Sequence, residues 1–302
     1  MTLYLVAGVG ASTDPPTGTV AAAACGHLPS LRARRYPSDT SDAEWALLAP
    51  LVPAGGPGPR GGRPPVHSRR DIVDAIRYVA HNGCVWRALP ADFPPWQTVH
   101  DYHTRWAADG TLGRIHNTLR DQARTADGRH PEPTAAIIDS QSVRAAETVA
   151  RASRGFDAGK KVNGRKRHIA VDTIGLLLVV MVSAASVQDR HAGRTVLAAL
   201  AACHRGVRLV WADSGYSGSL VSWAASSLAL TVHIVAKLAG QVGFHVLPRR
   251  WVVERTLSWI SRCRRTVRDY ERLPEHHAAM VQWSMIIIMT RRLTRRPKIT
   301  PT

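Results

Sequence analysis

Cysteine, long apolar runs and acidic residues are all scarce in this sequence of 302 residues. The four cysteines stand apart and form no C-x-x-C pair, which argues against a disulfide framework or a structural zinc site and indicates a reducing cytosol. No apolar run is long enough to span a bilayer, and the best one, 285–289, is expected to be a buried helix. The N-terminal apolar stretch has no basic residue before it and makes a poor signal peptide. We therefore expect a cytoplasmic protein without a membrane segment.

The shortage of acidic residues leaves a strongly basic chain. There are 40 Lys and Arg against 22 Asp and Glu, for a net charge of +18 and a pI near 11.0. A merely soluble basic surface does not explain why the positive charge is clustered, and clusters of this kind usually bind nucleic acid. A membrane-surface protein is disfavoured because the basic segments lack a separate amphipathic anchor.

Helix signals dominate the sequence between residues 36 and 126. Ser41 and Glu44 have the spacing of a capping box, Ser68 is placed to cap a second helix and Gly83 to end it. Two further helices are expected before residue 126. A helix-turn-helix-like DNA-binding module and an ordinary helical bundle both fit this periodicity, and the pattern does not choose between them.

After residue 133 the pattern changes to strands mixed with helices, which predicts an α/β fold built on a sheet. Strands are expected at 135–139, 167–172, 177–183, 207–213 and 231–236, and helices at 190–203, 218–227, 249–266 and 276–293. The expected organisation is a disordered leader, or translation from a start codon placed too early, at 1–35, a helical DNA-binding domain at 36–126, a linker at 127–133, an α/β domain at 134–296 and a tail at 297–302.

Three acidic residues stand out by position. Asp139 and Asp213 each close a short apolar run typical of a buried strand, and Glu254 lies in a stretch with helical spacing. Carboxylates gathered in this way bind hard divalent cations, and two such ions about 4 Å apart support phosphoryl transfer. From the residues alone, a metal site and ordinary structural roles are equally open. Two other acids have structural explanations, because Asp172 opens a hairpin turn and Asp189 is placed to cap a helix.

Basic residues lie close to these acids in the sequence. The segment 159–168 is so dense in Lys and Arg that its charges would repel one another without an anionic partner. A second basic group flanks and follows Glu254. The side chains that we expect to contact DNA phosphates are Lys160, Lys161, Arg165, Lys166, Arg167, Arg250, Arg255 and Arg262.

Six motifs between residues 36 and 295 complete the pattern. They are Y-P-S-D-T-S-D-A-E-W (36–45), G-C-V-W-R-A-L-P-A-D-F-P-P-W-Q-T-V (83–99), I-I-D-S-Q-S-V-R (137–144), G-K-K-V-N-G-R-K-R-H-I-A-V-D-T-I-G-L-L-L (159–178), A-D-S-G-Y-S-G (212–218) and R-W-V-V-E-R-T-L-S-W (250–259). Because these motifs occur in this order, the chain resembles the DDE transposases of bacterial insertion sequences. Within these it is similar to the group named for insertion sequence 5, which is related to the insertion sequence 4 family.

The resemblance implies a ribonuclease-H-like catalytic domain at 134–296, with a mixed sheet flanked by helices. It implies that Asp139, Asp213 and Glu254 hold two Mg²⁺ or Mn²⁺ ions, and that the helical domain helps to recognise terminal inverted repeats. Metal-activated water would nick DNA at the end of the element, and the freed 3′-hydroxyl would attack target DNA. Because two ends are joined, a homodimer is expected in the active complex, on the bacterial nucleoid.

The resemblance has departures, and other functions stay open. Related transposases carry a Tyr, an Arg and a Lys around the Glu. Arg250 fits the Arg, whereas Leu247 stands in place of the Tyr and Ser261 in place of the Lys. One alternative is a catalytically inactive DNA-binding remnant or self-repressor. Another is a structure-selective nuclease of similar fold.

Overall fold

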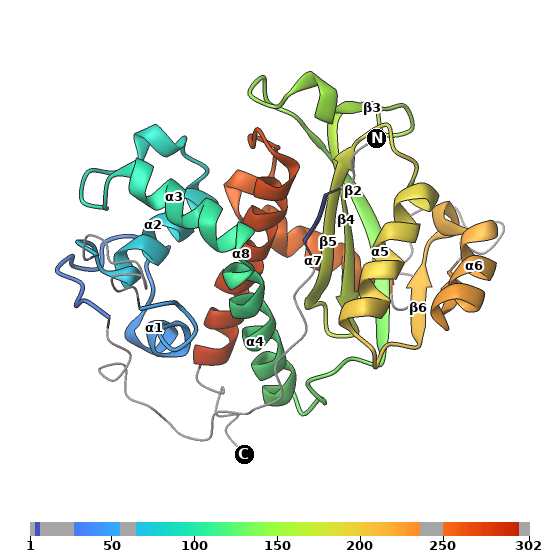
Figure 1. Cartoon of the computed structure of the whole chain (residues 1–302), viewed down its shortest axis with the longest axis horizontal. Helices are drawn as coiled ribbons and strands as arrows, with labels where there is room; N and C mark the ends of the chain where they lie inside the picture. The colour runs from blue at the N-terminus through green and yellow to red at the C-terminus, as the bar shows by residue number, and fades with distance from the viewer. Residues whose placement is uncertain (1–3, 7–26, 55–64, 236–249, 296–302) are drawn as a thin grey trace, which may run out of the picture.

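The computed structural model places a helical part beside a sheet part, with the long helix α8 between them (Figure 1). It describes residues 4–6, 27–54, 65–235 and 250–295. The helices are α1 (Asp42–Leu48), α2 (Arg69–Asn82), α3 (Trp96–Ala108), α4 (Thr111–Ala126), α5 (Asp189–Cys203), α6 (Ser219–Leu228), α7 (Arg250–Ser261) and α8 (Pro274–Thr294), with short 3₁₀ helices η2 (Trp86–Ala88), η3 (Arg151–Ser153), η4 (Ser214–Tyr216) and η5 (Arg264–Thr266).

Local sequence signals determine where the first two helices begin and end. The Ser41 hydroxyl accepts the Glu44 N–H while the Glu44 carboxylate accepts the Ser41 N–H, which confirms the predicted capping box of α1. The Ser68 side chain caps α2 by accepting the Arg70 N–H. Helix α2 stops at Gly83, whose φ of 74° is the left-handed conformation that glycine adopts at little cost.

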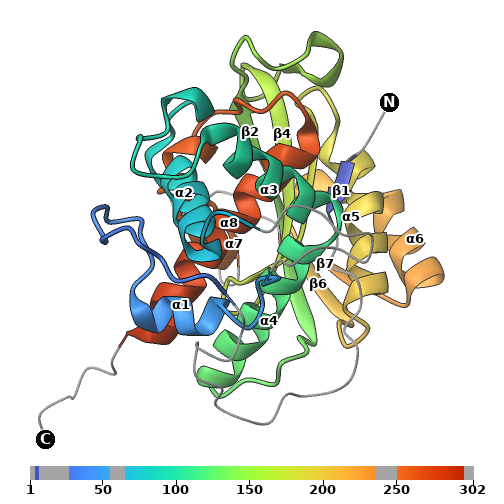
Figure 2. The ribbon, with the colours of Figure 1, turned by 60° about the vertical axis from the view of Figure 1, so that its left-hand side comes forward.

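Helix α8 joins the two parts into one core. It packs against α1, α2, α3 and α4 and also against α7 and strand β5 (Figure 2). The run at 285–289 is almost wholly buried, as predicted for it. The helical part is therefore built from both ends of the chain, a feature that the expected limits of 36–126 do not include. No helix in the described ranges is both long and apolar enough to cross a bilayer.

The sheet is mixed, and its central strand is β2. The strands are β1 (Tyr4–Val6), β2 (Ala135–Arg144), β3 (Gly155–Asp157), β4 (Val162–Asp172), β5 (Leu177–Ala184), β6 (Leu209–Ala212) and β7 (Thr231–Ile234). The order is β1-β5-β4-β2-β6-β7, and β3 pairs with β4. Strands β5, β4 and β2 are antiparallel, whereas β2, β6 and β7 are parallel. Helices α5 and α6 pack in the core of one face, and α7 and α8 in that of the other.

A mixed sheet flanked by helices and preceded by a helical region confirms the expected α/β fold class and is consistent with a ribonuclease-H-like fold. The β4–β5 hairpin also forms as predicted. Its turn is closed by the Asp172 carboxylate, which accepts the N–H groups of Ile174 at 2.9 Å and Leu176 at 2.8 Å.

Strands β2 and β4 and helix α7 differ most in length from the prediction. Strand β4 begins at Val162 and not at residue 167. Strand β2 continues past residue 139 to Arg144, because its second half stays paired with β4, so Asp139 lies within the strand and not at its end. Helix α7 ends at Ser261 instead of continuing to 266. The Thr266 hydroxyl donates to the carbonyls of Ile260 at 2.6 Å and Cys263 at 2.8 Å, and these bonds hold a tight turn after the helix.

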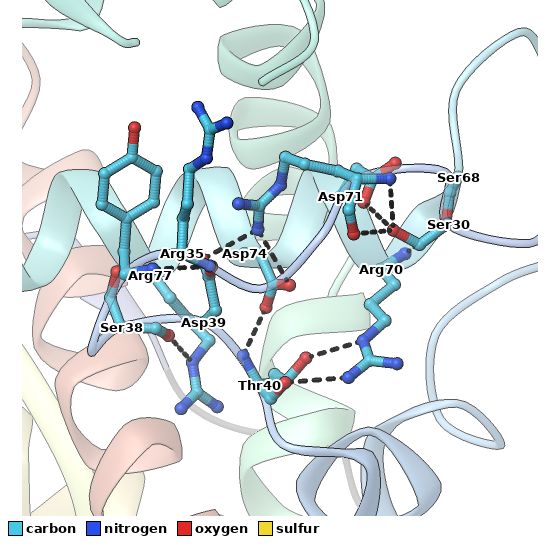
Figure 3. A network of polar contacts seen from close by, with 12 residues as sticks. Ser30, Arg35, Ser38, Asp39, Thr40, Ser68, Arg70, Asp71, Asp74 and Arg77 are labelled. Carbon is cyan, nitrogen blue, oxygen red and sulfur yellow. Dashed lines mark hydrogen bonds and ion pairs between the residues drawn. The ribbon is translucent and has the colours of Figure 1, made fainter. Parts of the chain in front are cut away.

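Parts of the N-terminal segment are ordered, so the prediction of a disordered leader at 1–35 is wrong for them. Tyr4–Val6 pairs as β1 with β5. Further on, the Ser30 hydroxyl donates to Asp71 at 2.6 Å (Figure 3), and Arg32 pairs with Asp39 at 2.8 Å. These bonds fasten residues 27–35 to the helical part. The predicted tail at 297–302 lies outside the described residues.

Candidate active site

Asp139 and Asp213 are neighbours because of the register between two parallel strands. Ile137 of β2 pairs with Trp211 of β6, so a step of two residues along each strand brings Asp139 opposite Asp213. Side chains two residues apart share a face of the sheet. Ile137 and Trp211 belong to the core that contains α7, so both acids face this helix.

Backbone donors orient both carboxylates. Asp139 Oδ1 accepts the Ser140 N–H at 2.7 Å, and Asp213 Oδ1 accepts the Gly215 N–H at 2.9 Å. Burial raises the pKa of Asp139 to about 6, and the nearby Asp213 charge acts in the same direction, whereas the Ser140 N–H, Arg250 and Lys160 lower it. Two carboxylates this close favour a shared positive charge between them.

Glu254 approaches the same region from α7. Arg250, one turn earlier on the helix, lies between the acids: its guanidinium is 3.8 Å from Asp213 Oδ2 and 3.8 Å from Glu254 Oε1. The Glu254 side chain is 47% exposed, so it can reorient without breaking a packed core. The structure thus brings the three predicted acids to one region, with an arginine bridging two of them.

The carboxylate oxygens of these three acids are suitable ligands for Mg²⁺ or Mn²⁺. Hard divalent cations prefer carboxylate oxygens, and Asp139 and Asp213 each have one oxygen that no backbone N–H occupies. Within the described ranges, however, no three His, Cys, Asp or Glu side chains are close enough together to hold a metal ion. Arg250 occupies the bridging position between Asp213 and Glu254. A cation bound by all three acids therefore requires Arg250 to move aside.

Asp189 belongs to this region, although sequence reasoning assigned it to a helix cap. Gln188 is the N-cap of α5, and Asp189 is the first helical residue without a capping bond, so that prediction is wrong. Its Oδ1 instead accepts the Ser140 hydroxyl at 2.8 Å and lies 3.1 Å from Lys166 Nζ. Its Oδ2 would be 3.7 Å from a Cβ built at Gly215, whose nearest neighbour is Asp213.

Tyr216 lies next to Ser140, in the core on the α5 side of the sheet. Its side chain is 1% exposed and hydrogen-bonded to Ser140. Burial raises the pKa of the phenol well above its usual value, and the charges of Asp189, Asp139 and Asp213 add to this effect. A signal for this network was present in the sequence: Asp189 follows β5 by one short loop, and Ser140 directly follows Asp139.

The basic segment at 159–168 divides into an exposed and a buried portion. Lys160 and Lys161 are exposed, and Lys160 Nζ donates to the Ser140 carbonyl at 3.3 Å, close to Asp139. Arg165, by contrast, is fully buried and pairs with Asp269 at 2.9 Å. Since its donors are used within the protein, this placement contradicts the prediction that Arg165 contacts DNA.

Lys166 and Arg167 are corrected in the same way. Lys166 is buried and donates to the Val187 carbonyl at 2.9 Å, in addition to its ion pair with Asp189. Arg167 is also buried, with bonds to Gln141 and to the Thr266 carbonyl. Both lie on β4, which has neighbouring strands on both edges and helices on both faces. Neither side chain is therefore accessible to DNA in this structure.

The remaining predicted DNA contacts lie on or just after α7. Arg250 lies beside the acids. Arg255 and Arg262 instead line a separate pocket next to the β4–β5 turn. Ser261, which stands where relatives carry a Lys, donates its hydroxyl to the Leu257 carbonyl at 2.9 Å. Leu247 lies outside the described residues.

Comparisons with known proteins relate the chain to transposase families. Residues 130–289, just over half of the chain, match the family model described as "Transposase DDE domain". Residues 40–116 match a model ascribed to transposases of the IS4/5 family (DUF4096). The uncharacterized protein y4sN of Sinorhizobium fredii is 33% identical over 113 residues, which cover 37% of this chain and 82% of that protein. No solved structure matches.

Proposed function

The chain belongs to the family of transposases with a DDE domain, and we propose that it catalyses metal-dependent cleavage of DNA at the inverted-repeat ends of an insertion sequence, followed by strand transfer into target DNA. Asp139, Asp213 and Glu254 are the proposed catalytic acids. The observation that supports this most directly is the β2–β6 register, which sets two acids side by side on the face covered by α7.

The chemistry divides between the metal and the protein. Two bound Mg²⁺ or Mn²⁺ ions would activate the attacking oxygen and stabilise the leaving oxygen of the phosphodiester. Asp139 and Asp213 would hold them through the oxygens that remain free, while the Ser140 and Gly215 N–H groups fix the carboxylate orientations. Glu254 would complete the set from α7, where its exposed side chain is free to turn.

Arg250 takes two roles in this proposal. Without metal it balances the charges of Asp213 and Glu254, at 3.8 Å from each. When cations take over that balance, the guanidinium becomes available to a DNA phosphate beside the reacting bond. Lys160 and Lys161 are exposed, and Lys160 lies close to Asp139. Both would hold the DNA backbone by the same charge attraction.

The helical part would help to recognise the inverted repeats, and a homodimer would bring two ends of the element together on the bacterial chromosome in the cytoplasm. DNA is the partner that the family implies. Helices α2 and α3 could act as a helix-turn-helix or as an ordinary bundle. Footprinting of the repeat with variants in each helix tests which of them contacts DNA.

The test is cleavage of a duplex that carries the element's end sequence. We expect Mg²⁺-dependent nicking by the native protein and none by Asp139→Asn, Asp213→Asn or Glu254→Gln, each with an unchanged far-UV spectrum. Glu147→Gln, an exposed acid in the turn after β2, is the matched control and should cleave normally. Normal cleavage by any of the three site variants would remove that residue from the proposed site.

The main alternative is a DNA-binding remnant or self-repressor without catalysis. It predicts specific binding to the same ends and no strand cleavage with any divalent metal. A structure-selective nuclease would instead cut branched DNA that lacks the inverted repeats. The same set of substrates, with and without repeats, therefore separates the three functions.

A further inference from the structure

A pocket of about 650 Å³ lies beside α7, and none of the three proposed catalytic acids lines it. Its walls come from α7, the C-terminal end of α8 and the β4–β5 turn. The side chains that define it are Trp251, Arg255, Trp259, Arg262, Arg291 and Arg295. We name it the α7–α8 pocket.

Positive charge dominates the α7–α8 pocket. Five arginines line it, and Asp127, the one carboxylate among its described lining residues, is already paired with Arg292. Burial lowers the pKa of Arg255, and the charge of Arg292 lowers it further, as expected where cations crowd together. Such crowding is unfavourable in the free protein and is relieved by an anion.

Arg255 is held in a fixed orientation inside the pocket. Its guanidinium carbon lies 4.2 Å from the ring centre of Trp251 and 4.7 Å from that of Trp259, which places the cation on two aromatic rings. One terminal nitrogen donates to the Ile174 carbonyl at 3.0 Å. The buried Nε has no hydrogen-bond partner among the residues that the structure describes, and Trp251 is 41% exposed. The site therefore combines an oriented cation with an accessible aromatic surface.

The charges are spread along two helices and do not converge on one point. Arg262 is on the α7 side, whereas Arg291 and Arg295 are on α8. At a rise of about 1.5 Å per residue, the pocket wall from Arg255 to the end of α7 at Ser261 extends about 9 Å, and Arg262 directly follows it. That length matches about three successive phosphates of one DNA strand. A small anion would contact only a few of these arginines, whereas a polyanion can contact several of them together.

We propose that the α7–α8 pocket binds the DNA backbone as it leads away from the cleavage site. The choice of DNA as the polyanion rests on the proposed function. The position of the pocket supports it, because Arg255 directly follows Glu254 on α7. DNA held at the proposed catalytic acids would therefore continue along the helix into the pocket.

The test is the salt dependence of DNA binding by the full chain in EDTA, with a labelled duplex and fluorescence anisotropy. The double variant Arg262→Ala/Arg295→Ala removes two exposed side chains that make no hydrogen bond or ion pair within the described structure. Each lost phosphate contact lowers the slope of log K against log[salt] by about 0.9, so we expect a total decrease of about 1.8. An unchanged slope would overturn the proposal.

The matched control is Arg194→Ala. Arg194 is also exposed and lies 5.0 Å from the ring centre of Trp223, but it belongs to α5 and does not line the pocket. We expect the native slope for this variant. A decrease equal to that of the double variant would show a general effect of net charge and would also contradict the pocket.

A second probe separates DNA from small anions. The fluorescence of Trp251 is identified as the signal that Trp251→Phe removes. DNA should quench this fluorescence, whereas inorganic pyrophosphate at the same phosphate concentration should not. Equal quenching by pyrophosphate would overturn the proposal in favour of a small-anion site. Both measurements exclude divalent metal and need no cleavage. Both measurements can therefore be interpreted even if the proposed cleavage reaction fails. Normal cleavage with an unchanged salt slope would reject only the proposed DNA binding by the α7–α8 pocket.

Discussion

At the scale of single residues, the role of a charged side chain depends on which environment its backbone position gives it. Lys160 and Arg165 come from one basic run, yet the first is exposed beside Asp139 and the second is buried against Asp269. Burial of a charge is tolerated only with a partner, and each Lys or Arg of β4 has a partner from another segment of the fold. Charge density in the sequence therefore overestimated the number of DNA contacts.

Asp189 gives a prediction at this scale. We expect Asp189→Asn to keep the acceptor for the Ser140 hydroxyl but to lose the charge that pairs with Lys166. Because Asp189 holds Ser140, whose N–H orients the proposed metal ligand Asp139, both cleavage and Mn²⁺ affinity should fall by about tenfold or more. Electron paramagnetic resonance of free Mn²⁺ measures the affinity independently of cleavage. Native affinity in this variant, with Glu147→Gln as control, would assign Asp189 a purely structural role.

At the scale of elements, the β4–β5 turn positions the helix that carries Glu254. The Thr256 hydroxyl donates to the Gly175 carbonyl at 2.8 Å, and Arg255 donates to the neighbouring Ile174 carbonyl. Gly175 has a φ of 87°, and a Cβ there would lie 2.8 Å from Thr256 Oγ1 and 3.2 Å from Trp259. A glycine is required at this position for its conformation and for the close approach of α7.

Gly175→Ala should therefore destabilise the protein by more than about 1 kcal/mol in urea unfolding, since both backbone strain and a clash oppose the new methyl group. Gly128→Ala is the matched control. Its φ of 70° imposes a similar strain, but a Cβ there meets nothing within 4 Å. The difference between the two variants measures the packing against α7. Equal losses of stability would show that this packing contributes nothing.

At the scale of the whole molecule, the two parts share one core and one set of buried polar contacts. Arg77 of α2 pairs with Glu44 of α1 at 2.9 Å and bonds Thr290 of α8 at 3.1 Å. The same Thr290 hydroxyl donates to Glu44. Residues from the beginning and the end of the described chain thus depend on each other, so we expect the helical part and the sheet part to unfold together.

Buried histidines predict the pH dependence of this stability. Burial lowers the pKa of His103 far below its usual value, that of His116 to about 3 and that of His204 to about 4. Below pH 6.5 the unfolded chain binds protons that these native histidines do not, so the free energy of unfolding falls with falling pH. Asp74 acts in the opposite sense, because burial raises its pKa to about 6.

Three histidines against one carboxyl leave a net uptake of about two protons on unfolding near pH 5, or about 3 kcal/mol per pH unit. Burial also lowers the pKa of His100, which adds to this uptake. At the site, Asp139 and His168 shift in opposite senses, to about 6 and about 3, and cancel. Urea unfolding from pH 7 to 4.5 measures the slope. His116→Gln should reduce it by about one proton, and a stability independent of pH would contradict the neutral state of these histidines.

Features that depend on local chemistry can be predicted from the sequence. The Ser41–Glu44 capping box, the stop at Gly83 and the turn at Asp172 are each set by side chains bonding to nearby backbone, so their spacing alone identifies them. The three proposed catalytic acids were also found, because apolar runs and helical periodicity marked the elements that carry them.

Which charged residues share the site depends on tertiary contacts. The register of β2 with β6 aligned Asp139 with Asp213, and the path of α5 brought Asp189 to Ser140. Packing on both faces of β4 buried Arg165 and its neighbours. These outcomes depend on contacts between residues far apart in the chain, and no pattern within one segment records which distant segment will cover it.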